Sequence, residues 1–97
     1  MDAKLEARTD TNSKPWCVYV LRCRNNSFYI GITNNLEKRL EQHTLGTGSK
    51  FVRSWRPFEL VKTIPCSDSG EARRLEYDLK RLTRKKKIEV LELRMGR

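Results

Sequence analysis

The sequence has 97 residues, of which 37% are hydrophobic and 34% are charged, a composition that predicts one small globular domain. Lysine and arginine number 21 against 12 aspartate and glutamate residues, so the net charge is +9. This excess favours nucleic acid as a partner, although it also fits a basic surface that binds no polyanion. No apolar run approaches the ~20 residues of a membrane-spanning helix, and the N-terminus lacks the apolar segment of a secretion signal. We therefore expect a cytoplasmic monomer with no membrane partner.

The three cysteines do not form a recognisable metal or disulfide motif. Cys17, Cys23 and Cys66 each lie in or beside an apolar run and have no CxxC spacing. They are typical of free, buried thiols in a reducing compartment. Because the sequence holds a single histidine besides them, a structural zinc site is not expected.

The domain is predicted to span residues 15–93. Residues 1–14 carry only Leu5 as a sizeable apolar side chain, too little to offset the entropy of ordering, so we expect a disordered N-terminal tail. Residues 94–97 are expected to form a short C-terminal tail.

Two strands are predicted at the start of the domain. Residues 16–23 are rich in Val, Tyr, Leu and Cys and fit a strand buried on both faces. Asn25 and Asn26 tolerate turn geometry, so a hairpin leads to a return strand over residues 28–33. Alternation puts Tyr19 on the face opposite Val18 and Val20, and Tyr29 and Gly31 on the face opposite Phe28, Ile30 and Ile32. Gly31 leaves space where another group can approach closely, or marks a bulge.

A helix is predicted from residue 35 to residue 45, capped by the preceding Thr-Asn-Asn and stopped by the Gly-Thr-Gly-Ser that follows. Leu36 and Leu40 form its apolar stripe. Arg39 and His43 lie four residues apart, one position from that stripe, and should lie where the helix meets the sheet. Residues 50–57 alternate basic and aromatic residues, which fits either a nucleic-acid contact or a surface loop anchored by Phe51 and Trp55.

The second half of the chain predicts a third strand over residues 58–64, a turn over residues 65–70 and a long helix over residues 69–87, capped by Ser67 or Ser69. Residues 88–93 extend this helix or form a short second one. Lys80, Arg84 and Lys87 should form one cationic row. The dense charge block of residues 84–87 fits either a solvated surface, as most such blocks are, or, in so basic a chain, a contact with phosphates.

Five residues are candidates for chemistry: Tyr19, Tyr29, Arg39, His43 and Glu76. The set suits attack of water on a phosphodiester, with arginine offsetting charge on phosphoryl oxygens. A carboxylate can hold a hard divalent ion, and tyrosine or histidine can move protons. Each residue also has an ordinary structural explanation: tyrosines in a sheet, an Arg–His pair at the helix–sheet boundary and an exposed helix glutamate.

The order and spacing of these residues resemble the GIY-YIG nuclease family. The similarity rests on Val18-Tyr19, on Tyr29-Ile30-Gly31 ten residues later, on Arg39 eight residues past the glycine, on His43 and on Glu76. Within the family, the chain is most similar to small stand-alone bacterial proteins of the UPF0213 type. The resemblance covers about residues 16–87.

The resemblance implies an α+β fold of β-β-α-β-α order, with a three-stranded antiparallel sheet and flanking helices. It implies a nuclease that hydrolyses DNA or RNA with one Mg²⁺ or Mn²⁺ ion. Glu76 would bind the metal, Arg39 would stabilise the phosphate, and His43 would assist proton transfer. Tyr19 and Tyr29 would position and activate the water, and which of them is the base stays open.

Two departures from the family pattern bear on function. Cys17 stands where the family has its first glycine, which removes backbone freedom but no catalytic group. The chain also has no room for the separate DNA-binding domain that the family usually attaches. Affinity would then come from the domain's own basic residues or from a protein partner, which predicts low sequence specificity. The candidate nucleic-acid contacts are Lys50, Arg53, Lys80, Arg84 and Lys87.

Two alternatives to a nuclease remain open from the sequence. One is a catalytically idle nucleic-acid-binding module on the same fold, which would need Lys50, Arg53, Lys80 and Arg84 but not Glu76. Its binding would depend on salt but would not lead to cleavage. The other is an accessory protein that docks on an acidic partner.

Overall fold

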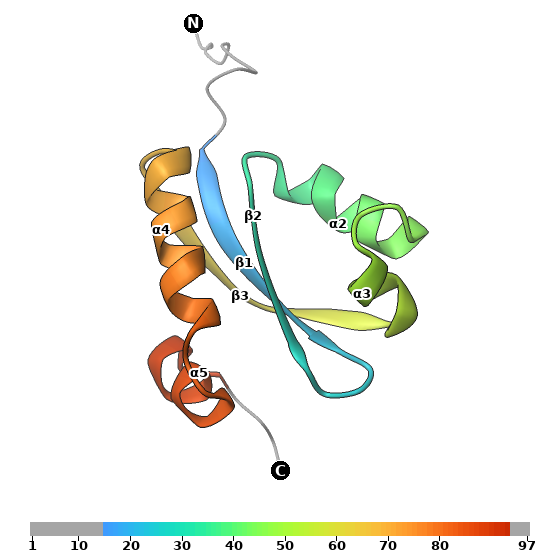
Figure 1. The fold of residues 1–97 in the computed structure, drawn as a ribbon. Helices are drawn as coiled ribbons and strands as arrows, with labels where there is room; N and C mark the ends of the chain where they lie inside the picture. Colours follow the sequence, from blue (N-terminus) through green and yellow to red (C-terminus); the bar gives the residue numbers. More distant parts are fainter. Residues whose placement is uncertain (1–14, 94–97) are drawn as a thin grey trace, which may run out of the picture.

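The computed structural model describes residues 15–93, and the tails predicted over residues 1–14 and 94–97 lie outside them. It contains a three-stranded antiparallel sheet with helices on both sides (Figure 1), which confirms the expected α+β fold. Among the described residues, no helix is both long and apolar enough to cross a bilayer. In chain order the elements are β1 (Trp16–Cys23), β2 (Phe28–Thr33), α2 (Leu36–Leu45), α3 (Lys50–Ser54), β3 (Phe58–Cys66), α4 (Ser69–Lys80) and α5 (Arg84–Leu91).

Strand β1 is the centre of the sheet, because the strand order is β2-β1-β3. Tyr19 on β1 lies directly opposite Gly31 on β2 and Thr63 on β3. The hairpin between β1 and β2 turns as expected, with Asn26 in the left-handed region at a φ of 71°.

The two faces of the sheet carry different side chains, as the alternation predicts. Val18, Val20 and Ile30 pack with Leu79 of α4 and Leu91 of α5 into an apolar cluster. On the opposite face, Tyr19, Leu21 and Cys23 pack with Val52 of α3, with Leu36 and Leu40 of α2 beside them. Figure 1 shows the sheet between these two helical layers.

Of the two interpretations of residues 50–57, the anchored surface loop is wrong in part, because α3 forms over Lys50–Ser54. Trp55 does pack against the buried cluster that contains Val52, and the nucleic-acid contact stays a prediction. The Ser49 side chain accepts a hydrogen bond from the Val52 amide at 3.3 Å and caps the helix. Val52 is wholly buried, whereas Phe51 is 41% exposed and does not anchor the segment. Five residues span less than two helical turns, too few to produce a visible hydrophobic period.

The single helix predicted over residues 69–87 is also wrong. Helix α4 ends at Lys80, and α5 begins at Arg84 after Thr83, whose hydroxyl accepts from the Lys86 amide at 3.2 Å. The cationic row of Lys80, Arg84 and Lys87 is therefore divided between two helices. The Thr83 cap stabilises the start of a second helix. The basic residues continue across residues 81–83, so the sequence pattern gives no sign that the first helix ends there.

Two boundaries also differ from the expectation. Asp68 caps α4 in place of Ser67 or Ser69, because its carboxylate accepts from the Glu71 amide at 2.8 Å. Strand β3 runs to Cys66 and includes Pro65, which was expected in a turn. An edge strand tolerates proline, since its outer N–H groups need no partner in the sheet.

Candidate active site

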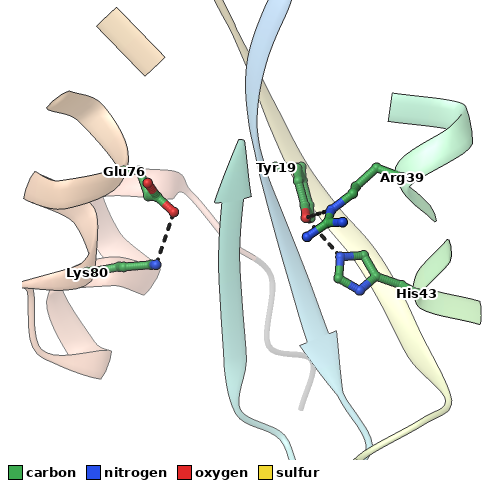
Figure 2. Close-up of polar contacts among 5 residues, drawn as sticks. All are labelled: Tyr19, Arg39, His43, Glu76 and Lys80. Carbon is green, nitrogen blue, oxygen red and sulfur yellow. Dashed lines mark hydrogen bonds and ion pairs between the residues drawn. The ribbon is translucent and has the colours of Figure 1, made fainter. Parts of the chain in front are cut away.

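Tyr19 is the centre of a buried polar group. Arg39 Nε donates a hydrogen bond to the Tyr19 hydroxyl at 3.1 Å, and the same hydroxyl lies 2.8 Å from His43 Nε2 (Figure 2). Tyr19 and His43 are wholly buried, while Arg39 is half-buried. The structure thus brings together three of the residues that the sequence singled out, from β1 and α2.

Helix α2 aims both of its functional side chains at the sheet because they are one turn apart. The Asn35 side chain caps the helix by accepting from the Lys38 amide at 3.2 Å, and Gly46 ends it with a left-handed φ of 85°. Beyond this end, the backbone of Gly48 packs on the imidazole. A Cβ at Gly48 would lie 2.7 Å from His43 Nδ1, so a side chain there would displace the ring.

Gly31 makes room for the phenol of Tyr19. The two residues are directly opposite on β1 and β2, and a Cβ on Gly31 would lie 2.5 Å from the Tyr19 hydroxyl oxygen. The close approach expected at this glycine is therefore made by Tyr19 itself. A side chain at this position would force the ring away from Arg39 and His43.

Tyr29 borders the same group. Its ring centroid lies 6.3 Å from that of Tyr19 and 5.3 Å from that of His43, in an edge-on arrangement with the imidazole. Tyr29 is half-buried. Together with Arg39, it gives the group its accessible surface, since Tyr19 and His43 have none.

Burial sets the charge state of this group. It raises the pKa of Tyr19 to about 12, against the opposing hydrogen bond from Arg39. It lowers the pKa of His43 below 6.5, and the positive charge of Arg39 lowers it further. The hydrogen bond to Tyr19 raises the pKa of Arg39. At neutral pH, the tyrosine is therefore protonated, the histidine neutral and the arginine charged.

The imidazole can pair with Tyr19 in either neutral tautomer. A hydroxyl oxygen has two acceptor sites, so Tyr19 can accept from Arg39 Nε and either donate to or accept from His43 Nε2. In both cases His43 Nδ1 is buried and has no hydrogen-bond partner among residues 15–93. An unpaired buried nitrogen is costly, so the arrangement is more readily explained by chemistry at Tyr19 than by stability.

Glu76 lies apart from this group. It belongs to α4, and in Figure 2 strand β2 passes between it and Tyr19. Its carboxylate forms an ion pair with Lys80 at 3.0 Å, and its side chain is 24% exposed. Among the causes that raise the pKa of Tyr19, the negative charge of Glu76 is the weakest. The two side chains are therefore within electrostatic range but share no direct contact among those found in the described residues.

The donor set around Glu76 fits a hard divalent ion better than zinc. Within residues 15–93, no three His, Cys, Asp or Glu side chains gather in one place. Mg²⁺ commonly uses one or two carboxylates and completes its coordination with water and substrate oxygens, whereas zinc needs three or four protein ligands. A single accessible carboxylate is compatible with the first kind of site.

The five predicted nucleic-acid contacts lie on two sides of the sheet. Lys50 and Arg53 are on α3, whereas Lys80, Arg84 and Lys87 are on α4 and α5. Arg84 also has a structural role, because it donates to the Asn26 carbonyl at 2.6 Å and lies 4.7 Å over the Phe28 ring. It thereby holds α5 against the β1–β2 hairpin.

Two residues of the site were missed from the sequence. Gln42 accepts from Arg39 Nη1 at 3.1 Å, and the Gly48 carbonyl accepts from Arg39 Nη2 at 3.4 Å. Gln42 was detectable, because residues three apart on a helix are neighbours. Gly48 had no signal beyond its glycine-rich context, since its role is a backbone contact.

Comparison with known proteins relates this geometry to a family. The model of the GIY-YIG catalytic domain matches residues 15–89. The UPF0213 protein XAC3202 of Xanthomonas axonopodis pv. citri is 44% identical over 79 residues, which are 81% of this chain and 78% of that protein. The UPF0213 protein OB0043 of Oceanobacillus iheyensis is 44% identical over 75 residues, or 77% and 87% of the two chains.

Solved structures agree with this relationship. The solution NMR structure of the protein EF2693 from E. faecalis has 38% identity and a TM-score of 0.61, over 82% of this chain and 85% of that one. The solution NMR structure of the UPF0213 protein BH0048 from Bacillus halodurans has 38% identity and a TM-score of 0.55, over 84% and 87%. With the family model matching most of the domain, this chain belongs to the GIY-YIG catalytic domain family, among proteins of the UPF0213 type.

Proposed function

We propose that the protein is a divalent-metal-dependent nuclease that hydrolyses phosphodiester bonds of DNA, or of RNA, with low sequence specificity. The observation that supports this most is the hydrogen-bonded group of Tyr19, Arg39 and His43 over the side-chain-free backbone of Gly31. Glu76, within electrostatic range of Tyr19, would complete the site from the far side of β2. A phosphate at this edge of the sheet would meet arginine on one side and the carboxylate on the other.

Arg39 is the proposed phosphate ligand. A guanidinium has five N–H groups, and the bonds to Tyr19, Gln42 and Gly48 use one on each of its nitrogens. Two remain, one on each terminal nitrogen. Tyr29 is a further hydrogen-bonding neighbour that raises the pKa of Arg39, so a phosphoryl oxygen would bind these groups beside Tyr29 or in its place. Because three partners already fix its orientation, little reorganisation is needed as negative charge develops in the transition state.

The two tyrosines would have different tasks. Tyr29 is half-buried and accessible to water, so it would contact the attacking water or the substrate. Tyr19 is wholly buried with a pKa of about 12, so at neutral pH it would hold Arg39 in place and exchange its proton with His43. Acting as a base itself, Tyr19 would need access to water and a further cation, because Arg39 alone does not offset the effect of burial on its pKa.

Glu76 is the proposed ligand of a single Mg²⁺ or Mn²⁺ ion. Such an ion, when bound, offsets charge on the phosphoryl oxygens and lowers the pKa of bound water. Glu76 would hold it at the edge of β2, opposite Arg39. Lys80 would have to release the carboxylate first, since the two side chains form an ion pair.

The basic residues would bind the sugar-phosphate backbone without reading bases. Lys50 and Arg53 on α3, with Lys80, Arg84 and Lys87 on α4 and α5, would contact phosphates on both sides of the sheet. Phosphate contacts position a nucleic acid but carry no sequence information. Selectivity for a particular target would then come from a protein partner.

The proposal is tested by cleavage of supercoiled plasmid and of labelled RNA with Mg²⁺ or Mn²⁺. We expect nicking that disappears with chelator and falls on the order of 10²–10³-fold in Arg39→Ala. Glu76→Gln should lose the metal-dependent activity, whereas Glu89→Gln on α5, whose carboxylate also pairs with a lysine, should retain it. Circular dichroism checks that each variant is folded. Absence of cleavage by the wild type, or full activity in both site variants, would reject the nuclease.

An idle nucleic-acid-binding module remains the second candidate, and two observations favour it. Glu76 is already paired with Lys80, and Tyr19 and His43 have no exposed surface. Such a module would bind DNA with a steep salt dependence. It would not cleave, and Glu76→Gln would not weaken its binding.

A further inference from the structure

The ion pair between Glu76 and Lys80 places a cation at the carboxylate proposed to bind metal. Lys80 Nζ lies 3.0 Å from Glu76 Oε2, one turn further along α4 (Figure 2). The lysine is at the last position of the helix, where a positive charge interacts favourably with the helix dipole. Its side chain is 54% exposed, against 24% for the glutamate.

The other helix neighbours of Glu76 do not help to bind a metal ion. The residues three and four positions away are Ala72, Arg73, Leu79 and Lys80, which are two cations and two apolar side chains. None of these four positions carries a second carboxylate, and Asp78 is two residues from Glu76, so it projects from a different side of the helix. A divalent ion coordinates carboxylate oxygen at about 2.0–2.6 Å, so the ion and an ammonium group in contact with the same oxygen exclude each other.

We propose that Lys80 is a built-in competitor of the divalent ion at Glu76. This inference rests on the proposed metal role of Glu76 and adds a regulatory property to it. Without metal and substrate, the lysine keeps the carboxylate neutralised. When the ion binds, the long and largely exposed side chain of Lys80 turns away and becomes available to a substrate phosphate.

The competition makes the metal site weak in the free protein. An exposed ion pair at this helix spacing is worth only enough free energy to weaken metal binding at Glu76 by about twofold. The repulsion between the ammonium and a nearby divalent charge adds to that effect even in water. Removal of the lysine charge should therefore tighten metal binding by roughly threefold to tenfold.

The test measures binding of Mn²⁺ itself by the full chain, without nucleic acid. Paramagnetic broadening of backbone amide signals around Glu76 in an NMR titration reports occupancy of this site. The variants are Lys80→Gln and, as a matched control, Lys86→Gln. Lys86 lies 3.6 Å from Glu89 on α5, so the control removes one positive charge and one helix ion pair elsewhere. Glu76→Gln identifies the site.

The inference predicts at least threefold tighter Mn²⁺ binding in Lys80→Gln, unchanged binding in Lys86→Gln and no specific broadening in Glu76→Gln. If broadening requires Glu76 but has the same midpoint in Lys80→Gln and the wild type, the competition is rejected while the metal site stands. If Lys80→Gln and Lys86→Gln tighten binding equally, the effect is one of net charge and the inference is also rejected. If no variant binds Mn²⁺, both the inference and the metal-dependent nuclease fail.

Discussion

The two faces of the central strand make opposite use of burial. Val18 and Val20 bury hydrocarbon against α4 and α5, whereas Tyr19, between them in the sequence, buries a hydroxyl against Arg39 and His43 on the other face. The first face gains free energy of folding in proportion to the apolar area that it removes from water. On the second face, burial also removes polar groups from water, which costs free energy of folding. One of these groups, His43 Nδ1, has no hydrogen-bond partner in the described residues. We infer that one face is purely apolar in its buried part, whereas the other combines apolar packing with the buried polar group of the proposed site. The proposed metal ligand Glu76 lies on α4, which covers the apolar face.

Among the changes that compare the two faces of β1, Tyr19→Phe should have the largest effect. This change removes the hydroxyl that joins Arg39 to His43 but keeps the ring. We expect the proposed nuclease activity to fall by roughly 10²-fold, in line with the loss of a proton-transfer or positioning group, with a smaller effect on stability. Plasmid nicking and urea unfolding measure the two quantities. A variant that is unstable but normally active would contradict the division between the faces.

Gly31→Ala should damage both stability and activity. The new methyl group would meet the rigid ring of Tyr19, and such overpacking typically costs about 1–3 kcal/mol. Gly70→Ala on α4 is the control, because its Cβ would meet no rigid ring but Asp68 Oδ1, the capping oxygen of α4, at 3.3 Å and Arg74 Nη1 at 3.7 Å. The control should be neutral or slightly stabilising, since alanine favours a helix over glycine. Equal unfolding free energies for the two variants would show that Gly31 does not serve to accommodate Tyr19.

Val18→Ala should lower stability and leave activity unchanged, whereas Tyr19→Phe should mainly lower activity. Val18 is wholly buried in the apolar cluster, so we expect a loss of about 2 kcal/mol in the free energy of unfolding from lost burial and the cavity left behind. Cleavage by the folded fraction should be unchanged. A loss of activity comparable to that of Tyr19→Phe would show that the two faces are coupled through β1.

The smallest effect should be a dependence of stability on pH that comes from the polar face. The pKa of His43 lies below 6.5 because of burial and then Arg39. As the pH falls below 6.5, the unfolded chain binds a proton that the native protein does not. Stability should therefore decrease on acidification, by up to about 1.4 kcal/mol per pH unit.

His43→Gln should flatten this dependence. Urea unfolding at several pH values between about 5 and 7.5 compares the variant with the wild type, in a range where most carboxylates stay ionised. If the unfolding free energy changed with pH at the same slope in the two proteins, the pKa of His43 would not be lowered by folding. Because the comparison uses slopes, a general loss of stability in the variant does not affect it.

Parts of the site could be predicted because they follow from local periodicity. The spacing of Arg39 and His43 by one helical turn and the alternation along residues 16–23 predicted which side chains meet at the sheet. The helix break at residues 81–83 and helix α3 were missed. Each depends on one capping contact, from Thr83 for the break and from Ser49 for α3. The run of basic residues and the basic–aromatic alternation at these places are more conspicuous in the sequence than a single capping residue.

The sequence alone determined the three strands, the faces of Tyr19 and Val18 and the family, because alternation, helical spacing and ordered motifs are properties of the chain itself. Tertiary structure decided two further matters: that the Tyr19 phenol lies over Gly31 and that its pKa rises to about 12. Both depend on burial and on contacts between elements distant in sequence. The pair of Lys80 with Glu76 is local to α4, but an exposed ion pair is too weak to be assigned from spacing alone.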